Sequence, residues 1–126
     1  MTKLIPQPVT TPETERFWAE LGEGRFCVPQ CQACGRAHWY PRAFCPFCFS
    51  EEIAVKPSFG EATIYSFSAM NTSPPLVMAY VELTEGPKLM TNIVDVDVAA
   101  IRIGMKVKPV WRSAEGGGQV PFYTAA

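Results

Sequence analysis

Cys31-Gln-Ala-Cys34 and Cys45-Pro-Phe-Cys48 are two Cys-x-x-Cys pairs separated by ten residues. Each pair can close a tight turn that aims both sulfur atoms inward, so the two turns together offer four thiolates to one tetrahedral metal ion. Zinc suits four soft thiolates, and a site closed in this way is structural because no position is open to water or substrate. The stretch therefore predicts a zinc ribbon. Iron, two disulfides and four buried free thiols are the alternatives.

A fifth cysteine and the histidine lie near the two pairs. Cys27 lies in an apolar run, and we expect it to pack as a small hydrophobic residue. His38 is the only histidine, and it could replace one thiolate, but four cysteines already complete a tetrahedral shell. The predicted metal ligands are therefore Cys31, Cys34, Cys45 and Cys48.

Length, charge and the start of the chain limit the function further. The 126 residues are a usual size for one domain, but a ribbon of about 25 residues cannot build its own apolar core, so a metal must replace one. The formal net charge of −1 disfavours a protein that neutralises many phosphates. Residues 1–6 do not have the pattern of a secretory leader, and no apolar run approaches the roughly 20 residues that cross a bilayer. We expect a cytoplasmic protein whose cysteines stay reduced and bind metal.

The segments around the cysteines predict a helix followed by short strands. Thr11 can cap a helix that has Pro12 in its first position, and Gly22 can end it. Residues 25–30 and 38–41 are predicted to be two strands of a hairpin with the metal at its tip. Residues 53–58 are predicted to be a short strand or an extended linker.

From Gly60 onward the sequence has the composition and alternation of β-strands. Strands are predicted at residues 62–69, 76–84, 89–96, 105–112 and 120–124, with a helical turn at 97–101 before the fourth. Val77, Ala79, Val81 and Leu83 are predicted to share one face. Five strands in this order fit a Greek-key barrel such as the OB-fold. We therefore predict a mainly β protein with an N-terminal arm and helix at 1–22, a four-cysteine zinc ribbon at 23–58 and a five-stranded OB-fold barrel at 59–126.

The order of helix, ribbon and barrel resembles a family of acyl-CoA-associated proteins that combine a rubredoxin-like zinc ribbon with an OB-fold. The resemblance covers nearly the whole chain, and it depends on the order and spacing of short motifs rather than on any single one. These motifs are Phe17-Trp18, Gly24-Arg-Phe26, Cys31 to Gly35, Tyr40-Pro-Arg42, Cys45 to Cys48, Gly60 to Ser66, Ala79 to Pro87, Ile103 to Val107 and Val120-Pro-Phe122. The chain departs from the pattern in having one proline before Arg42 where two are common, and in having Phe49 directly after Cys48.

The resemblance implies a non-catalytic accessory subunit that binds and stabilises a catalytic partner of the thiolase superfamily. Such partners include thiolases, hydroxymethylglutaryl-CoA synthase assemblies, acyltransferases and lipid-transfer-protein-like aldolases that shorten steroid side chains held as CoA thioesters. Some relatives are joined to hydratases that act on the same thioesters. In such complexes the partner typically supplies the catalytic residues, and the zinc-ribbon subunit can contribute to the acyl-CoA channel. We therefore expect a hetero-oligomer, one structural zinc ion per chain, and acyl-CoA at the partner interface.

Two groups of side chains are candidate contacts in such a complex. Four cations follow one another without an acid between them and could attract the phosphates of CoA, although a solvated outer strand face is the favoured interpretation. Five aromatic residues around the cysteines exceed what a small ribbon can bury, which suits a protein partner, and packing inside the protein is the alternative. The cations are Arg102, Lys106, Lys108 and Arg112, and the aromatic residues are Trp39, Tyr40, Phe44, Phe47 and Phe49.

Two other functions stay open from the residues alone. OB-folds and zinc ribbons also bind single-stranded nucleic acid, and Tyr65 and Phe67 could stack on bases, although the net charge opposes this. Iron in the four-thiolate site would give a redox protein, although the gap between the pairs is shorter than in rubredoxin. Asp95 and Asp97 are predicted to cap the helical turn rather than to catalyse. The sequence contains no Gly-x-Ser-x-Gly, phosphate-binding loop or HExxH motif, which supports a non-catalytic role.

Overall fold

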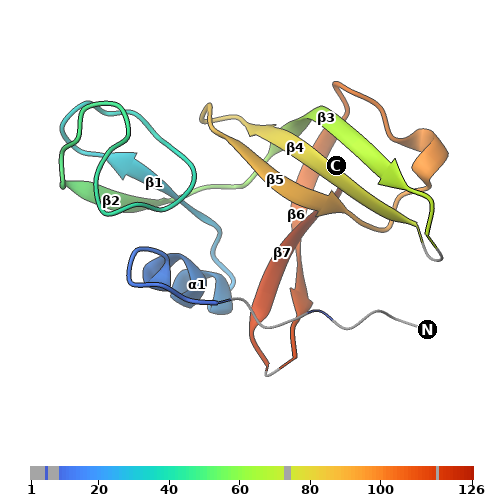
Figure 1. Cartoon of the computed structure of the whole chain (residues 1–126), viewed down its shortest axis with the longest axis horizontal. Helices are drawn as coiled ribbons and strands as arrows, with labels where there is room; N and C mark the ends of the chain where they lie inside the picture. Colours follow the sequence, from blue (N-terminus) through green and yellow to red (C-terminus); the bar gives the residue numbers. More distant parts are fainter. Residues whose placement is uncertain (1–4, 6–8, 73–74, 116) are drawn as a thin grey trace. The chain divides into compact units, whose positions relative to one another are not determined.

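The computed structural model describes residues 5, 9–72, 75–115 and 117–126. By its contacts the chain divides into two compact units, Met1–Phe59 with Trp111–Val120, and Gly60–Val110 with Pro121–Ala126. The first unit contains helix α1 (Glu15–Gly22) and strands β1 (Cys27–Cys31) and β2 (Ile53–Pro57) (Figure 1). The remaining elements are β3 (Ala62–Met70), β4 (Leu76–Leu83), β5 (Lys88–Ile93), the short 3₁₀ helix η1 (Val98–Ala100), β6 (Lys106–Ser113) and β7 (Gln119–Ala125). Among the described residues, no helix is long and apolar enough to cross a membrane.

Helix α1 begins at Glu15, so the predicted start at Pro12 is wrong. Residues 11–14 form a turn instead, in which the Thr14 N–H donates to the Thr11 carbonyl and the Thr11 N–H donates to Thr14 Oγ1, both at 3.0 Å. The hydroxyl of the buried Thr14 is therefore used within the turn and makes no cap bond to the helix. The helix ends at Gly22, as predicted.

Strand β1 pairs with β2, which corrects the predicted hairpin. The two strands are antiparallel, with Cys31 opposite Ile53. Residues 38–41 form no strand, and this part of the chain contributes only an isolated bridge between Ala37 and Gln30. Pro41 has no N–H to extend a ladder, which is one physical reason that the pairing stops. Both Cys-x-x-Cys turns therefore lie at or after the end of β1, in the long connection to β2.

An aromatic core joins α1 to the ribbon. The ring of the buried Phe17 packs edge-on against Trp18, Phe26 and Trp39, at centroid distances of 5.0, 5.9 and 5.0 Å. Phe26 and Trp39 also stack on each other at 6.3 Å. This core supplies the apolar burial that a ribbon of this size lacks.

Strands β3 to β7 close a barrel in the order β3-β4-β5-β7-β6, which confirms the predicted five-stranded barrel (Figure 1). The strand β4 alternates as predicted, with Val77, Ala79, Val81 and Leu83 buried. Asp97 caps η1 by accepting a 3.1 Å hydrogen bond from the Ala99 N–H, which was also predicted.

The fully buried Tyr123 donates a 2.7 Å hydrogen bond from its hydroxyl to the Gly60 carbonyl. Burial, together with the charge of Glu85, raises the pKa of Tyr123 above its ordinary value, so the hydroxyl stays a donor.

We expect Tyr123→Phe to lower the free energy of unfolding by about 1–2 kcal/mol, because the buried hydrogen bond from Tyr123 to the Gly60 carbonyl is lost. Urea denaturation followed by circular dichroism measures the change. The exposed Tyr80 provides the control, and Tyr80→Phe should stay within about 0.5 kcal/mol of wild type. Equal midpoints for the two variants would contradict the prediction.

Candidate metal centre

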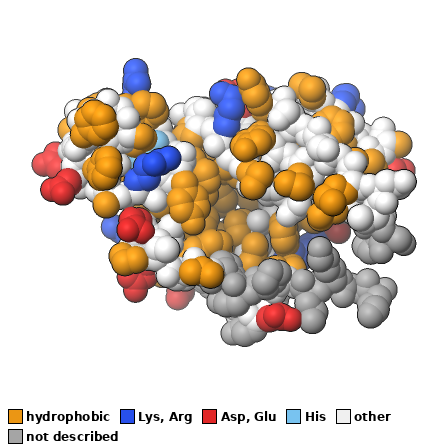
Figure 2. Space-filling view, viewed as in Figure 1, with side chains coloured by type: hydrophobic (Ala, Val, Ile, Leu, Met, Phe, Trp, Pro, Cys, Tyr) orange, Lys and Arg blue, Asp and Glu red, His pale blue; other side chains and the backbone are white. Residues whose placement is uncertain are grey.

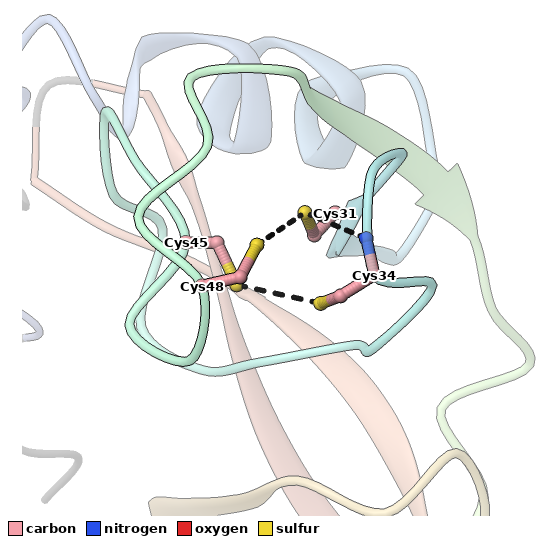
Figure 3. A group of neighbouring side chains, drawn as sticks. All are labelled: Cys31, Cys34, Cys45 and Cys48. Atoms are coloured by element: carbon pink, nitrogen blue, oxygen red, sulfur yellow. Dashed lines mark hydrogen bonds between the residues drawn. The ribbon is translucent and has the colours of Figure 1, made fainter.

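Four cysteine sulfurs converge between the two Cys-x-x-Cys turns. The Sγ atoms of Cys31, Cys34, Cys45 and Cys48 lie within 4.8 Å of one another, and Figure 3 shows them gathered between the two loops. The distance is 3.5 Å from Cys31 Sγ to Cys48 Sγ and 3.7 Å from Cys34 Sγ to Cys45 Sγ. A tetrahedral ion with bonds of about 2.3 Å to sulfur spaces its ligands by about 3.8 Å, whereas the sulfurs of a disulfide are about 2.0 Å apart. The cluster therefore fits one four-coordinate metal ion and does not have the geometry of disulfides.

The two turns have the same backbone hydrogen bonds. In the first, the Gly35 N–H donates to the Cys31 carbonyl at 2.9 Å, and in the second the Phe49 N–H donates to the Cys45 carbonyl at 2.9 Å. The first sulfur of each pair also accepts a backbone hydrogen bond, at 3.4 Å from the Cys34 N–H to Cys31 Sγ and at 3.3 Å from the Phe47 N–H to Cys45 Sγ. These bonds orient the Sγ atoms of Cys31 and Cys45, the first cysteine of each pair.

The residue after each pair adopts the left-handed backbone region, with φ of 79° at Gly35 and 66° at Phe49. Glycine adopts this region freely, whereas a side chain with a Cβ costs about 1–2 kcal/mol there. The sequence showed that phenylalanine follows Cys48, but the backbone cost at that position was missed. The signal was available, because Gly35 occupies the corresponding position of the other turn.

The pKa values of the cluster thiols are shifted by backbone hydrogen bonds and by the neighbouring thiols. Hydrogen bonds from backbone N–H groups, that of Cys34 first, lower the pKa of the Cys31 thiol to about 7. The Ser50 backbone N–H lowers the pKa of Cys48, but the neighbouring thiols and burial outweigh it and raise that pKa to about 12. Four thiolates this close to one another repel, which opposes full deprotonation of the cluster. A bound divalent ion would remove this repulsion, and its binding would release the remaining thiol protons.

Cys27 and His38 lie outside the four-sulfur cluster. Cys27 is buried, as predicted, and burial raises the pKa of its thiol. His38 is only 2% exposed, and neither of its ring nitrogens has a hydrogen-bond partner among the described residues. Burial, assisted by the positive charge of Arg42, lowers the pKa of His38. His38 is therefore a neutral residue of the interior at neutral pH.

The buried imidazole predicts a loss of stability in acid. Because the folded pKa is below the ordinary value of about 6.5, the unfolded chain takes up a proton that the folded chain resists as the pH falls below that value. We expect the free energy of unfolding of the zinc-loaded protein to fall more between pH 7.5 and 5.5 in wild type than in His38→Leu. Urea denaturation at each pH measures both proteins. Protonation of the cysteines affects both alike, so parallel pH profiles would contradict the prediction.

Three of the four predicted cations, Lys106, Lys108 and Arg112, lie on β6, and Arg102 precedes that strand. Lys106 and Lys108 flank the buried Val107 on β6 and are exposed, and Lys106 Nζ donates to Thr63 Oγ1 at 3.2 Å. Arg102 is exposed and Arg112 is partly buried. This alternation is that of a solvated strand face, and a contact to CoA stays a prediction.

The five aromatic residues around the cysteines divide into two groups. Trp39 is partly buried and packs in the aromatic core. Phe44 and Phe49 are exposed and contact each other, with ring centroids 6.4 Å apart, and the Arg36 guanidinium lies 4.8 Å above the Phe47 ring. Figure 2 shows hydrophobic side chains at the surface of the ribbon. We call the exposed group the ribbon aromatics, and it consists of Tyr40, Phe44, Phe47 and Phe49.

Family comparisons match the chain in two consecutive segments. Residues 18–54 match the model of the ChsH2 rubredoxin-like zinc ribbon domain, and residues 56–112 match that of the ChsH2 C-terminal OB-fold domain. A DUF35 domain-containing scaffold protein of Methanocaldococcus jannaschii is 31% identical over 82% of this chain and 79% of that protein. The chain belongs to the ChsH2/DUF35 family.

Other members of the ChsH2/DUF35 family are parts of enzyme assemblies. A solved structure described as "Ltp2-ChsH2(DUF35) aldolase" has a chain that matches this one with a TM-score of 0.84 and 28% identity, over 94% of this chain and 98% of that chain. The "Probable enoyl-CoA hydratase alpha subunit" of Thermomonospora curvata is 32% identical over 98% of this chain. This chain spans only 40% of that hydratase subunit.

Proposed function

We propose that this chain is a ChsH2-type accessory subunit that binds and stabilises a catalytic partner of the thiolase superfamily. An aldolase of the Ltp2 type, a thiolase and an acyltransferase are the candidate partners, each acting on acyl-CoA thioesters. The observation that carries the proposal is the match to the ChsH2 chain of an aldolase complex over 98% of that chain. Steroid or lipid breakdown in the cytoplasm is the setting that this partner class implies.

In the proposal, zinc occupies the four-thiolate cluster and its role is structural. Cys31, Cys34, Cys45 and Cys48 would hold the ion, and all four positions of a tetrahedral shell would then be filled by protein. The ion supplies cross-linking between the two Cys-x-x-Cys turns and no chemistry on a substrate. The ribbon that carries the exposed aromatic residues would thereby be fixed in shape.

The chain's own reactive groups support a non-catalytic role. The single histidine is buried and has no hydrogen-bond partner among the described residues. The thiol of Cys27 is buried with a raised pKa, so it stays protonated and a poor nucleophile. A nucleophile and a base within hydrogen-bond reach are what covalent catalysis needs, and these two residues do not supply them.

The ribbon aromatics are the proposed contact with the partner. They expose apolar rings next to a guanidinium, and aromatic and arginine side chains are enriched at protein interfaces. Arg102, Lys106, Lys108 and Arg112 are the proposed contacts with the phosphates of CoA, at a point where this chain borders the partner's acyl-CoA channel.

Co-expression with a thiolase-like or Ltp2-like protein from the same operon tests the proposal. The two chains should co-elute in size-exclusion chromatography, and the partner's turnover of its acyl-CoA thioester should depend on this chain. Separate elution, with partner activity indifferent to this chain, would contradict the proposal.

The same preparation also tests the two alternative functions, an iron redox protein and a nucleic-acid-binding module. One zinc per colourless chain opposes an iron redox protein, whereas a salt-sensitive shift of fluorescent single-stranded DNA at micromolar protein would favour a nucleic-acid-binding module.

A further inference from the structure

Phe49 occupies a backbone position where a glycine would fold more easily. Its turn repeats the hydrogen bonds of the first turn, where the corresponding residue is Gly35. Both residues adopt positive φ, 66° at Phe49 and 79° at Gly35. The chain therefore has a phenylalanine at a position where the backbone conformation alone would favour glycine.

The Phe49 ring recovers little of this cost inside the folded chain. It is 72% exposed, and the ring contact that the structure describes is with Phe44, which is itself 49% exposed. A side chain that is mostly in water contributes little to the hydrophobic stability of its own fold. The benefit of the ring must therefore lie outside the isolated chain.

The surroundings of Phe49 indicate the chemistry of what covers it. The ribbon aromatics are each about half exposed or more, and together they expose roughly 400 Å² if each such residue offers about 200 Å². That is about half of the roughly 800 Å² that each partner buries in a stable protein complex. Arg36, which lies over Phe47, makes no ion pair with a described residue, so its charge is available to an acidic group across the contact.

We propose that Phe49 is the anchor of the contact with the catalytic subunit, and that its ring inserts into an apolar pocket bordered by a carboxylate that pairs with Arg36. This inference rests on the proposed function and adds the residue and the chemistry of the pocket. Buried aromatic and arginine side chains near the centre of an interface carry most of its binding energy. The strained turn then presents the ring outward in a fixed direction, which reduces the entropy lost on binding.

The variant Phe49→Gly tests this inference because it should change stability and binding in opposite directions. Removal of the Cβ relieves the backbone, so the melting temperature of the isolated zinc-loaded chain should rise by a few degrees. Removal of the ring should weaken the Kd for the co-purified thiolase-like or Ltp2-like subunit about 30-fold or more. Differential scanning calorimetry and isothermal titration calorimetry give the two values.

Gly35→Ala is the matched control in the other turn. A Cβ at Gly35 meets nothing within 4 Å, so this variant adds backbone strain without a clash and without removing a ring. Its melting temperature should fall, whereas its Kd should stay within about threefold of wild type when the zinc content is unchanged. Arg36→Ala should weaken the Kd about fivefold and reduce its dependence on salt.

The outcomes separate this inference from the proposed function. A wild-type chain that binds neither class of subunit overturns both. A wild-type chain that binds, with an equal Kd for Phe49→Gly, overturns the anchor role and leaves the accessory role intact. A lower melting temperature for Phe49→Gly would mean that the ring supports the ribbon itself, and this result also overturns the inference.

Discussion

Replacement of Cys45 by Ser should reduce bound zinc from one ion per chain to a small fraction and disorder the ribbon. The Cys45 sulfur is one of four that lie within 4.8 Å of one another, so its loss leaves an incomplete tetrahedron with three thiolates. A serine hydroxyl is a far weaker ligand than a thiolate, because zinc binds deprotonated ligands and the hydroxyl stays protonated at neutral pH. Structural zinc contributes on the order of 10 kcal/mol to the folding of small zinc domains, and this exceeds the margin of stability of most domains.

Elemental analysis of the purified chain gives the zinc content, and hydrogen exchange of the backbone amides in β1 and β2 reports the order of the ribbon. Cys27→Ser is the matched control, because Cys27 is a buried cysteine outside the cluster. It should keep one zinc per chain, with only a local loss of stability. A Cys45→Ser chain with full zinc content would contradict the prediction. If its zinc is lost while the complex with the partner keeps full yield and activity, the metal is not what positions the interface.

The metal cluster and the barrel could be predicted because both depend on local patterns in the sequence. The four predicted ligands lie in two short motifs, and the turn that each motif forms orients the first of its two sulfurs through a backbone hydrogen bond. The strand β4 buries every second residue, and this alternation is visible in the sequence before any partner strand is known.

The errors concern contacts between residues that are distant in the sequence, or competition between local hydrogen bonds. The pairing of β1 with β2 brings Cys31 opposite Ile53, and the sequence favoured the nearer segment that contains Pro41. The helix start depended on whether Thr11 would cap the helix or close a turn with Thr14. Both arrangements use hydrogen bonds from a backbone N–H to a threonine hydroxyl, so the sequence does not distinguish them. To predict the left-handed backbone at Phe49, the two turns have to be compared residue by residue. Composition and periodicity do not contain that comparison.

Replacement of Phe17 by Ala should lower the free energy of unfolding of the first unit by about 3–5 kcal/mol, the usual cost of removing a buried phenylalanine ring. Phe17 is buried, and its ring packs against Trp18, Phe26 and Trp39 at centroid distances of 5.0 to 5.9 Å. The variant leaves a cavity where α1 meets the ribbon, and three large rings lose their common neighbour. Urea denaturation followed by tryptophan fluorescence measures the change, because Trp18 and Trp39 lie in this core.

Phe59→Ala removes the same side chain from an exposed position and should change the free energy of unfolding by less than about 0.5 kcal/mol. A loss below about 1 kcal/mol for Phe17→Ala would contradict the assignment of Phe17 to the core. Zinc content separates the two kinds of damage, since Phe17→Ala should retain its ion while Cys45→Ser should lose it. If Phe17→Ala still binds the catalytic subunit at permissive temperature, the metal-fixed turns alone present the contact. If binding is lost while zinc is retained, the aromatic core is needed to hold α1 and the ribbon in the binding conformation.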